Sequence, residues 1–129
     1  MLISSVKEKP KVSQNFQAGD YLIFQIESGY GLLRILAIEE TNGEKIWHLT
    51  AYNELFLDSE TADAAIENLN ALTISLPHVA LTNRAFESTQ TARMSNKPLN
   101  EIELQPLYDW KNSGGEIFDR SVRLMLGLR

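Results

Sequence analysis

The side chains with the clearest chemical potential are the two histidines, His48 and His78. An imidazole titrates near neutral pH, so either could act as a general base, and with a nearby carboxylate they could form a facial metal triad. The spacing does not bring them together, because the sequence holds no H-x-x-x-H or E-x-x-H pattern. We therefore expect structural or surface roles for both. A small hydrolase or metal-dependent enzyme that uses His48 or His78 is the alternative.

Other signatures of catalysis and cofactor binding are missing from the sequence. The chain has no cysteine, which excludes disulfide scaffolds, thiolate zinc sites, iron–sulfur clusters and cysteine nucleophiles. The Ser28–Gly31 stretch is not a nucleophile elbow, and no phosphate-binding glycine motif is present. The sequence thus predicts no catalytic residue, no cofactor and no metal, and a protein that is not an enzyme.

A cation-free midsection is the more informative feature. From Ile46 to Asn83 there is no Lys or Arg, while five acidic residues give this segment a charge of −5, equal to that of the whole chain. Charge runs usually serve solvation, but an uncompensated acidic face also steers positively charged partners. We expect a basic protein to bind here, with Tyr52 and Phe56 as neighbouring aromatic anchors. The five acidic residues are Glu54, Asp58, Glu60, Asp63 and Glu67.

Length and charge set the class of protein. The chain has 129 residues, which is typical of one domain, and its pI near 5.0 argues against nucleic-acid binding. No apolar run approaches the ~20 residues of a membrane-spanning helix, and the N-terminus lacks a secretory signal. We expect a flexible N-terminus over 1–15, a single domain over 16–129, and a cytoplasmic protein without membrane contact.

Three strands are expected to open the domain. They cover Asp20–Glu27, Leu32–Glu39 and Lys45–Tyr52, and they are joined by glycine-containing turns, of which Asn42-Gly43 is a strong hairpin signal. Alternation in the third strand places Trp47, Leu49 and Ala51 on one face, and Ile46, His48 and Tyr52 on the other. The result is an antiparallel three-stranded meander.

Short elements follow the meander. Asp58 or Ser59 is expected to cap a helix whose apolar stripe includes Ala62 and Ile66. Short strands are expected at Leu72–Leu76, ending at Pro77, at Val79–Leu81 and at Pro98–Leu104, with a loop over Asn83–Asn96. A helix should begin at Pro106 and end at Gly114-Gly115. Phe118–Leu128 fits a helix or a strand, and its arginines favour the helix.

These elements predict an α+β domain: an N-terminal antiparallel three-stranded meander, as an SH3-like partial barrel, with two or three short helices.

Three stretches of the sequence carry a family resemblance. They are Phe16-Gln-Ala-Gly19-Asp20, then Gly29-Tyr30-Gly31 followed by Leu33 and Ile35, and the tail with Leu107, Trp110, Gly114-Gly115 and Phe118. Together they resemble the bacterial immunity-protein family 26 of polymorphic toxin systems. The resemblance implies a cytoplasmic protein that binds and neutralises a cognate toxin and has no catalytic residues of its own.

The sequence therefore favours a non-enzymatic binding protein of immunity or inhibitor type, which engages a basic protein through its acidic midsection. A self-associating structural module is a further alternative, in which an uncovered sheet edge pairs with a second copy to give a homodimer.

Overall fold

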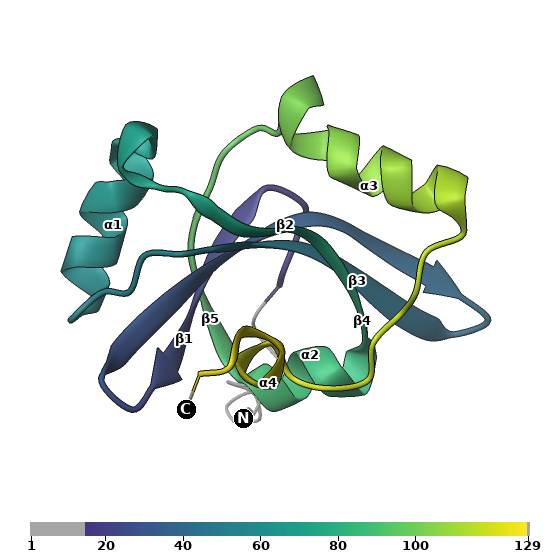
Figure 1. The fold of residues 1–129 in the computed structure, drawn as a ribbon, viewed down its shortest axis with the longest axis horizontal. Coiled ribbons are helices and arrows are strands. Elements are labelled where there is room, and N and C mark those ends of the chain that lie inside the picture. Colours follow the sequence, from purple (N-terminus) through teal and green to yellow (C-terminus); the bar gives the residue numbers. More distant parts are fainter. Residues whose placement is uncertain (1–14, 129) are drawn as a thin grey trace, which may run out of the picture.

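Residues 15–128 of the computed structural model are described, and they form one five-stranded sheet with helices on both faces (Figure 1). The predicted flexible segment 1–15 lies outside these residues except for Asn15. The strand order is β4-β3-β2-β1-β5, and neighbours are antiparallel. The strands are β1 (Asp20–Ile26), β2 (Gly29–Thr41), β3 (Glu44–Tyr52), β4 (Ile74–Thr82) and β5 (Thr91–Asn96). The helices are α1 (Ser59–Glu67), the short 3₁₀ helix η3 (Leu69–Ala71), α2 (Asn83–Thr89), α3 (Glu101–Ser113) and α4 (Val122–Leu126).

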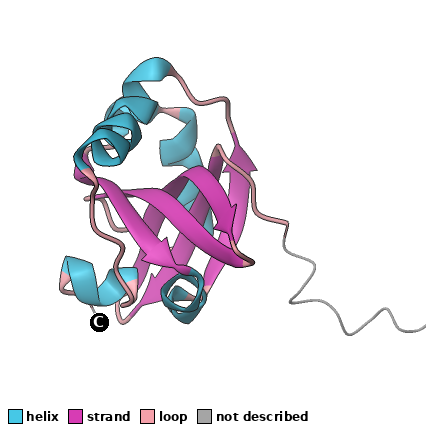
Figure 2. Ribbon diagram, turned by 90° about the vertical axis from the view of Figure 1, so that its right-hand side faces the viewer, coloured by secondary structure: helices cyan, strands magenta, loops and turns pink. Residues whose placement is uncertain are grey.

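The α+β prediction is confirmed, but the sheet differs from the SH3-like partial barrel that was expected. Two further strands, β4 and β5, extend it on either side of β1, β2 and β3, and it stays open with β4 and β5 as its edges. Within residues 15–128, four α-helices pack around the sheet, where two or three were expected. Figure 2 shows α-helices lying on both sides of the sheet.

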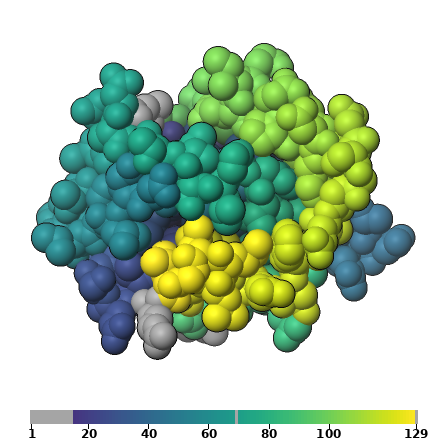
Figure 3. Space-filling model, in the orientation of Figure 1, coloured from purple at the N-terminus to yellow at the C-terminus, as the bar shows by residue number. Residues whose placement is uncertain are grey.

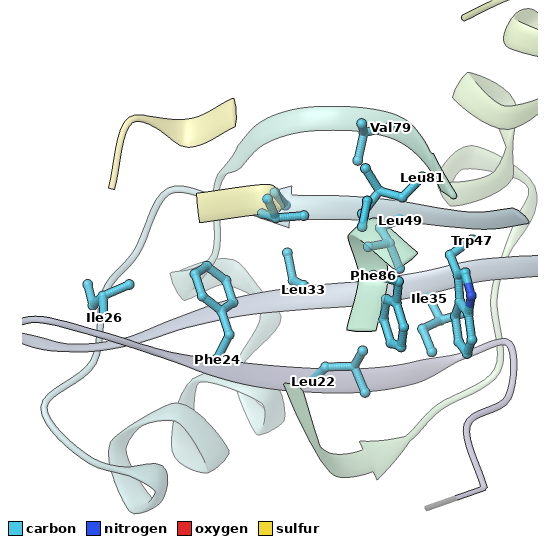
Figure 4. Packing of buried hydrophobic residues seen from close by; sticks show 13 residues of the cluster. Leu22, Phe24, Ile26, Leu33, Ile35, Trp47, Leu49, Val79, Leu81 and Phe86 are labelled. Carbon is cyan, nitrogen blue, oxygen red and sulfur yellow. The ribbon is translucent and has the colours of Figure 1, made fainter. Parts of the chain in front are cut away.

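One face of the sheet carries the larger apolar core (Figure 4). Trp47, Leu49 and Ala51 point to this face as alternation predicted, and α2 covers them with Phe86, whose ring stacks on Trp47 at 3.7 Å between centroids. Val122 of α4 is fully buried in the same core. A shallow, open pocket beside Trp47 and Phe86 lies at the edge of this core, next to the β2–β3 hairpin.

The opposite face carries α1 and α3. The apolar side of α1 packs on Tyr21 and Leu32, whereas α3 lies over more polar strand residues. Among these is Arg34, which is 2% exposed and donates hydrogen bonds to Gly19 O at 2.7 Å and to Glu103 Oε1 at 3.2 Å. The chain can bury this charge because Glu103 neutralises it. Both sets of candidate residues lie on this face.

Several local predictions were wrong, and prolines account for two of them. β4 continues through Pro77, because β4 is an edge strand and Pro77 falls at a register shift, where it has no paired residue in β3. The predicted strand at Pro98–Leu104 belongs largely to α3, which begins in a capping box formed by Asn100 and Glu103 and contains Pro106 in its interior.

The polar stretch Asn83–Asn96 was predicted as a loop and instead forms α2 and β5. Three of its residues, Ala85, Phe86 and Thr89, bury one side of α2, so a few inward side chains suffice to hold a largely polar segment. The helical alternative for the tail is confirmed in shorter form as α4, which ends at Gly127. Across residues 15–128, no helix has the length and apolar character needed to cross a bilayer.

Candidate functional site

The acidic residues of α1 lie on the side of the helix that faces away from the sheet. On the side of α1 that faces the sheet, Ala62, Ala65 and Ile66 are buried. The acidic residues of the helix are exposed. Glu60, Asp63 and Glu67 follow a three- and four-residue spacing, which places them on one side of a helix. Amphipathic patterning therefore turns three carboxylates outward together.

The five predicted acidic residues differ in how they are engaged. Thr73 donates to Glu54 from its backbone N–H at 2.8 Å and from its hydroxyl at 2.6 Å. Burial raises the pKa of Glu54, but these hydrogen bonds outweigh it, and the pKa lies below its usual value. Asp58 is the N-cap of α1 and accepts from the N–H of Thr61 at 2.8 Å, and hydrogen bonds from Thr61 lower its pKa.

Three carboxylates remain on the helix itself. Glu67 pairs with Lys97, with 3.3 Å between Oε1 and Nζ. Glu60 and Asp63 make no ion pair within the described residues, and they stay exposed. The midsection therefore keeps a net negative charge, and Lys97, which lies outside the midsection, compensates one of its carboxylates.

The predicted aromatic anchors are less accessible than expected. Phe56 is 9% exposed, because its backbone bridges Tyr30 and its ring packs between α1 and the sheet. Tyr52 is half-buried, with its ring stacked on that of Tyr21. The exposed apolar side chains are instead the neighbours of Phe56: Leu55 is 49% exposed and Leu57 is 83% exposed. Alternation around a buried Phe56 is the signal that could have identified them.

We call this region the acidic surface: the exposed side of α1 together with the segment leading into it. It comprises Glu54, Leu55, Leu57, Asp58, Glu60, Asp63 and Glu67.

The two histidines are brought together, although their spacing did not predict it. Nδ1 of His48 lies 2.9 Å from Nε2 of His78, and Nε2 of His48 lies 2.9 Å from Oε1 of Glu39. The other oxygen of Glu39 accepts from Lys111 of α3 at 2.8 Å. The ring of Trp110 packs against both imidazoles, with centroids 4.9 and 5.4 Å away. We call this group the histidine cluster.

A bulge in β2 places Glu39 in this cluster. Ile35 pairs with Leu49 and Ala37 pairs with His48, so Leu36 is an extra residue that has no counterpart in β3. An extra residue reverses which face the following side chains occupy. Without it, Glu39 would share the face of Ile35 and point into the apolar core. Sequence alternation alone could not predict that Glu39 lies on the same face as His48.

The protonation states of the cluster follow from its geometry. Hydrogen bonds from Lys111 and His48 lower the pKa of Glu39, so its carboxyl is ionised and must accept from Nε2–H of His48. In a neutral His48 with its proton on Nε2, Nδ1 is the acceptor, so it accepts a hydrogen bond from the Nε2–H of His78. Burial lowers the pKa of His48, and burial together with His48 lowers the pKa of His78 to about 4. Both rings are therefore neutral at pH 7.

The three side chains of the cluster are not arranged around one common point, as ligands of a single metal ion would be. The two nitrogens of His48 point in opposite directions, one to His78 and one to Glu39, so one ion could not meet all three side chains. Within residues 15–128, no group of three or more such side chains is placed so that it could hold a metal ion. His48 is also fully buried, which leaves His78 as the ring that reaches the surface.

Comparisons of the chain with protein-family models, with curated proteins and with solved structures find no match.

Proposed function

We propose that this protein is a non-enzymatic binding protein of immunity or inhibitor type, and that it engages a positively charged protein through its acidic surface. The observation that carries the proposal is the exposed side of α1, where Glu60 and Asp63 point outward and make no ion pair within residues 15–128. Two unpaired carboxylates on one rigid helix attract cations at a defined position.

Exposed apolar residues beside these charges add to the proposal. Leu57 is 83% exposed and directly precedes the helix cap Asp58. Apolar side chains at the centre of an interface supply affinity, whereas surrounding charges supply rate and specificity. Leu55 and Leu57 take the role that the sequence assigned to Tyr52 and Phe56. An interface of ordinary size, roughly 800 Å² per partner, is within reach of a domain with 7579 Å² of accessible surface.

The test is affinity capture from cells that carry this gene, with bound proteins quantified at low and high salt. We expect one basic protein to be enriched, and its recovery to fall at high salt because exposed charges are screened over ~8 Å at physiological ionic strength. The double variant Glu60→Lys/Asp63→Lys should slow association about tenfold or more.

The matched control is Glu44→Lys/Glu87→Lys, which changes the net charge equally but places the new cations at the β2–β3 hairpin and on α2. This variant should still capture the partner. If both double variants behave alike, overall charge and not the acidic surface is responsible, and the proposal fails.

The histidine cluster favours a second candidate function, acid–base or nucleophilic hydrolysis by His78. The specific observation is the chain of contacts Glu39–His48–His78, which would orient and polarise the more exposed ring. The test is hydrolysis of p-nitrophenyl acetate by the wild type and by His78→Gln, with free imidazole as the reference. A rate no greater than that of imidazole, or one unchanged in the variant, would exclude it.

A further inference from the structure

A second apolar feature lies beside the acidic surface, in a groove between the start of β4 and the first half of α3. Its volume is about 200 Å³. The surface is hollowed between the teal segment that includes α1 and η3 and the green α3 (Figure 3). Tyr21, Thr50 and Tyr52 of the sheet form its floor. Leu72, Ile74 and Pro77 line one side, and Ile102, Glu103 and Pro106 of α3 line the other.

The walls of the groove expose apolar surface to water. Ile74 is 55% exposed and Ile102 is 84% exposed, and they lie on opposite sides. Contiguous apolar exposure of this kind commonly marks a site of interaction. An apolar side chain entering the groove would be covered from both sides.

The groove is formed in advance. Its floor is held by the Tyr21–Tyr52 stack, with 6.3 Å between ring centroids, and the guanidinium of Arg34 lies 4.2 Å from the centre of the Tyr21 ring. Arg34 is itself fixed by Glu103. A rigid pocket lowers the entropic cost of binding.

Carboxylates lie next to wall residues on both sides of the groove. Glu54 is hydrogen-bonded to Thr73, the residue before Ile74. On the other wall, Glu101 precedes Ile102 and makes no ion pair within the described residues. No lysine or arginine of residues 15–128 lines the groove, and Arg34, which lies against the Tyr21 ring of its floor, is buried and already paired with Glu103. The groove is therefore lined mainly by apolar side chains, its one lining carboxylate (Glu103) is paired with Arg34, and further carboxylates lie beside both of its walls.

We propose that this groove receives an apolar side chain of the basic partner, with flanking lysines or arginines of that partner contacting Glu54 and Glu101. The inference rests on the proposed function, because it assigns to the same partner a second point of contact. Charge complementarity identifies the occupant: an apolar residue set among basic ones fits an apolar cavity with carboxylates beside its walls.

The first experiment follows the side-chain methyl groups of Ile74 and Ile102 by NMR while three pentapeptides are added. One has a leucine between two pairs of lysines, one has serine in its place, and one has leucine between pairs of glutamates. We expect the lysine–leucine peptide to shift both isoleucines. The serine peptide should shift only resonances near the carboxylates, and the glutamate peptide should shift none.

Equal isoleucine shifts with the leucine and serine peptides would overturn the groove proposal and leave the acidic surface standing. Shifts at neither the isoleucines nor α1 with either lysine peptide would count against both proposals.

The second experiment uses the captured partner itself. Ile102→Lys places a cation in the groove wall at a position that is 84% exposed, so folding should be retained. We expect this variant to weaken binding about tenfold, because it removes an apolar contact and repels the partner's cations. Leu124→Lys on α4, at a position that is 68% exposed, is the matched control and should change binding by less than about twofold. Equal effects of the two variants would reject the groove, whatever Glu60→Lys/Asp63→Lys does.

Discussion

Nδ1 of His48 and Nε2 of His78 lie 2.9 Å apart, so imidazoles from adjacent antiparallel strands share a hydrogen bond. Such a pair accepts one extra proton without breaking, because one ring can then donate to the other. It cannot accept two, because both facing nitrogens would then carry hydrogens. The cluster therefore couples the packing of β3, β4 and α3 to pH.

The first prediction concerns stability against pH. Burial holds the pKa of His78 at about 4, below its ordinary 6.5, so the unfolded chain binds more protons than the folded one between these values. Stability from this residue is then complete above pH 6.5 and is lost as pH falls toward 4. Denaturant unfolding should show the wild type losing about 1–2 kcal/mol more than His78→Gln between pH 7 and pH 4.5. Parallel curves for the two proteins would contradict this.

A second prediction concerns Glu39, which joins β2 to β3 through His48 and to α3 through Lys111. Glu39→Gln keeps a hydrogen-bond acceptor for His48 but removes the charge that faces Lys111. We expect a loss of about 1 kcal/mol in the free energy of unfolding. Glu40→Gln, at the exposed neighbouring position, serves as control and should change it by less than about 0.5 kcal/mol. Equal values for the two variants would show that Glu39 is not part of the cluster in solution.

A third prediction concerns the placement of Trp110. A Cβ on Gly115 would lie 2.1 Å from Cδ1 of Trp110, whose Nε1–H donates to Glu116 O at 3.0 Å. Gly115→Ala must therefore displace the indole and disturb the histidines beneath it, at a cost of about 1–3 kcal/mol. The indole N–H resonance of Trp110 should shift, while that of Trp47 on the other face of the sheet should not.

Gly114→Ala is the control for this change. Gly114 has a φ of +67° but open space around its Cβ position, so the substitution strains the backbone without touching the indole. A Trp110 resonance that moves equally in both variants would show that the close approach at Gly115 is unimportant.

A fourth prediction concerns the buried Arg34. Removing its carboxylate partner by Glu103→Ala leaves a charge that is 2% exposed without compensation and also removes half of the α3 capping box. We expect a loss of about 2–4 kcal/mol in thermal or denaturant unfolding. Glu101→Ala, in the same helical turn and without an ion pair in the described part of the chain, should cost less than about 1 kcal/mol. A small effect at Glu103 would mean that water reaches the guanidinium.

The parts of the fold that could be predicted from sequence are those set by local pattern. Asn42-Gly43 correctly predicted the turn between β2 and β3, and alternation in β3 correctly predicted that Trp47 and His48 lie on opposite faces. The cap at Asp58 and the stripe of α1 were equally visible. In each case the decisive residues are neighbours in the chain, so no distant contact could override them.

The parts that sequence missed depend on pairing at long range. β5 forms because Thr91–Asn96 pairs with the otherwise free edge of β1. Its polar composition does not predict a strand. The histidine cluster requires the β3–β4 pairing, the bulge at Leu36 and the packing of α3 against these strands. None of these is indicated by a pattern in the neighbouring sequence. For the acidic surface, the sequence identified the charges but predicted Tyr52 and Phe56 as the exposed anchors, whereas the exposed apolar side chains are Leu55 and Leu57.

The bulge at Leu36 divides β2 into two parts that differ in which alternate side chains face the core. Before it, odd-numbered residues such as Ile35 enter the core, and after it, even-numbered residues such as Ile38 do so. Gaining or losing one residue between Ile35 and Glu39 would exchange inside and outside for the rest of the strand, while leaving its composition almost intact. The length of this short stretch is therefore as strictly constrained as the identity of any side chain in it.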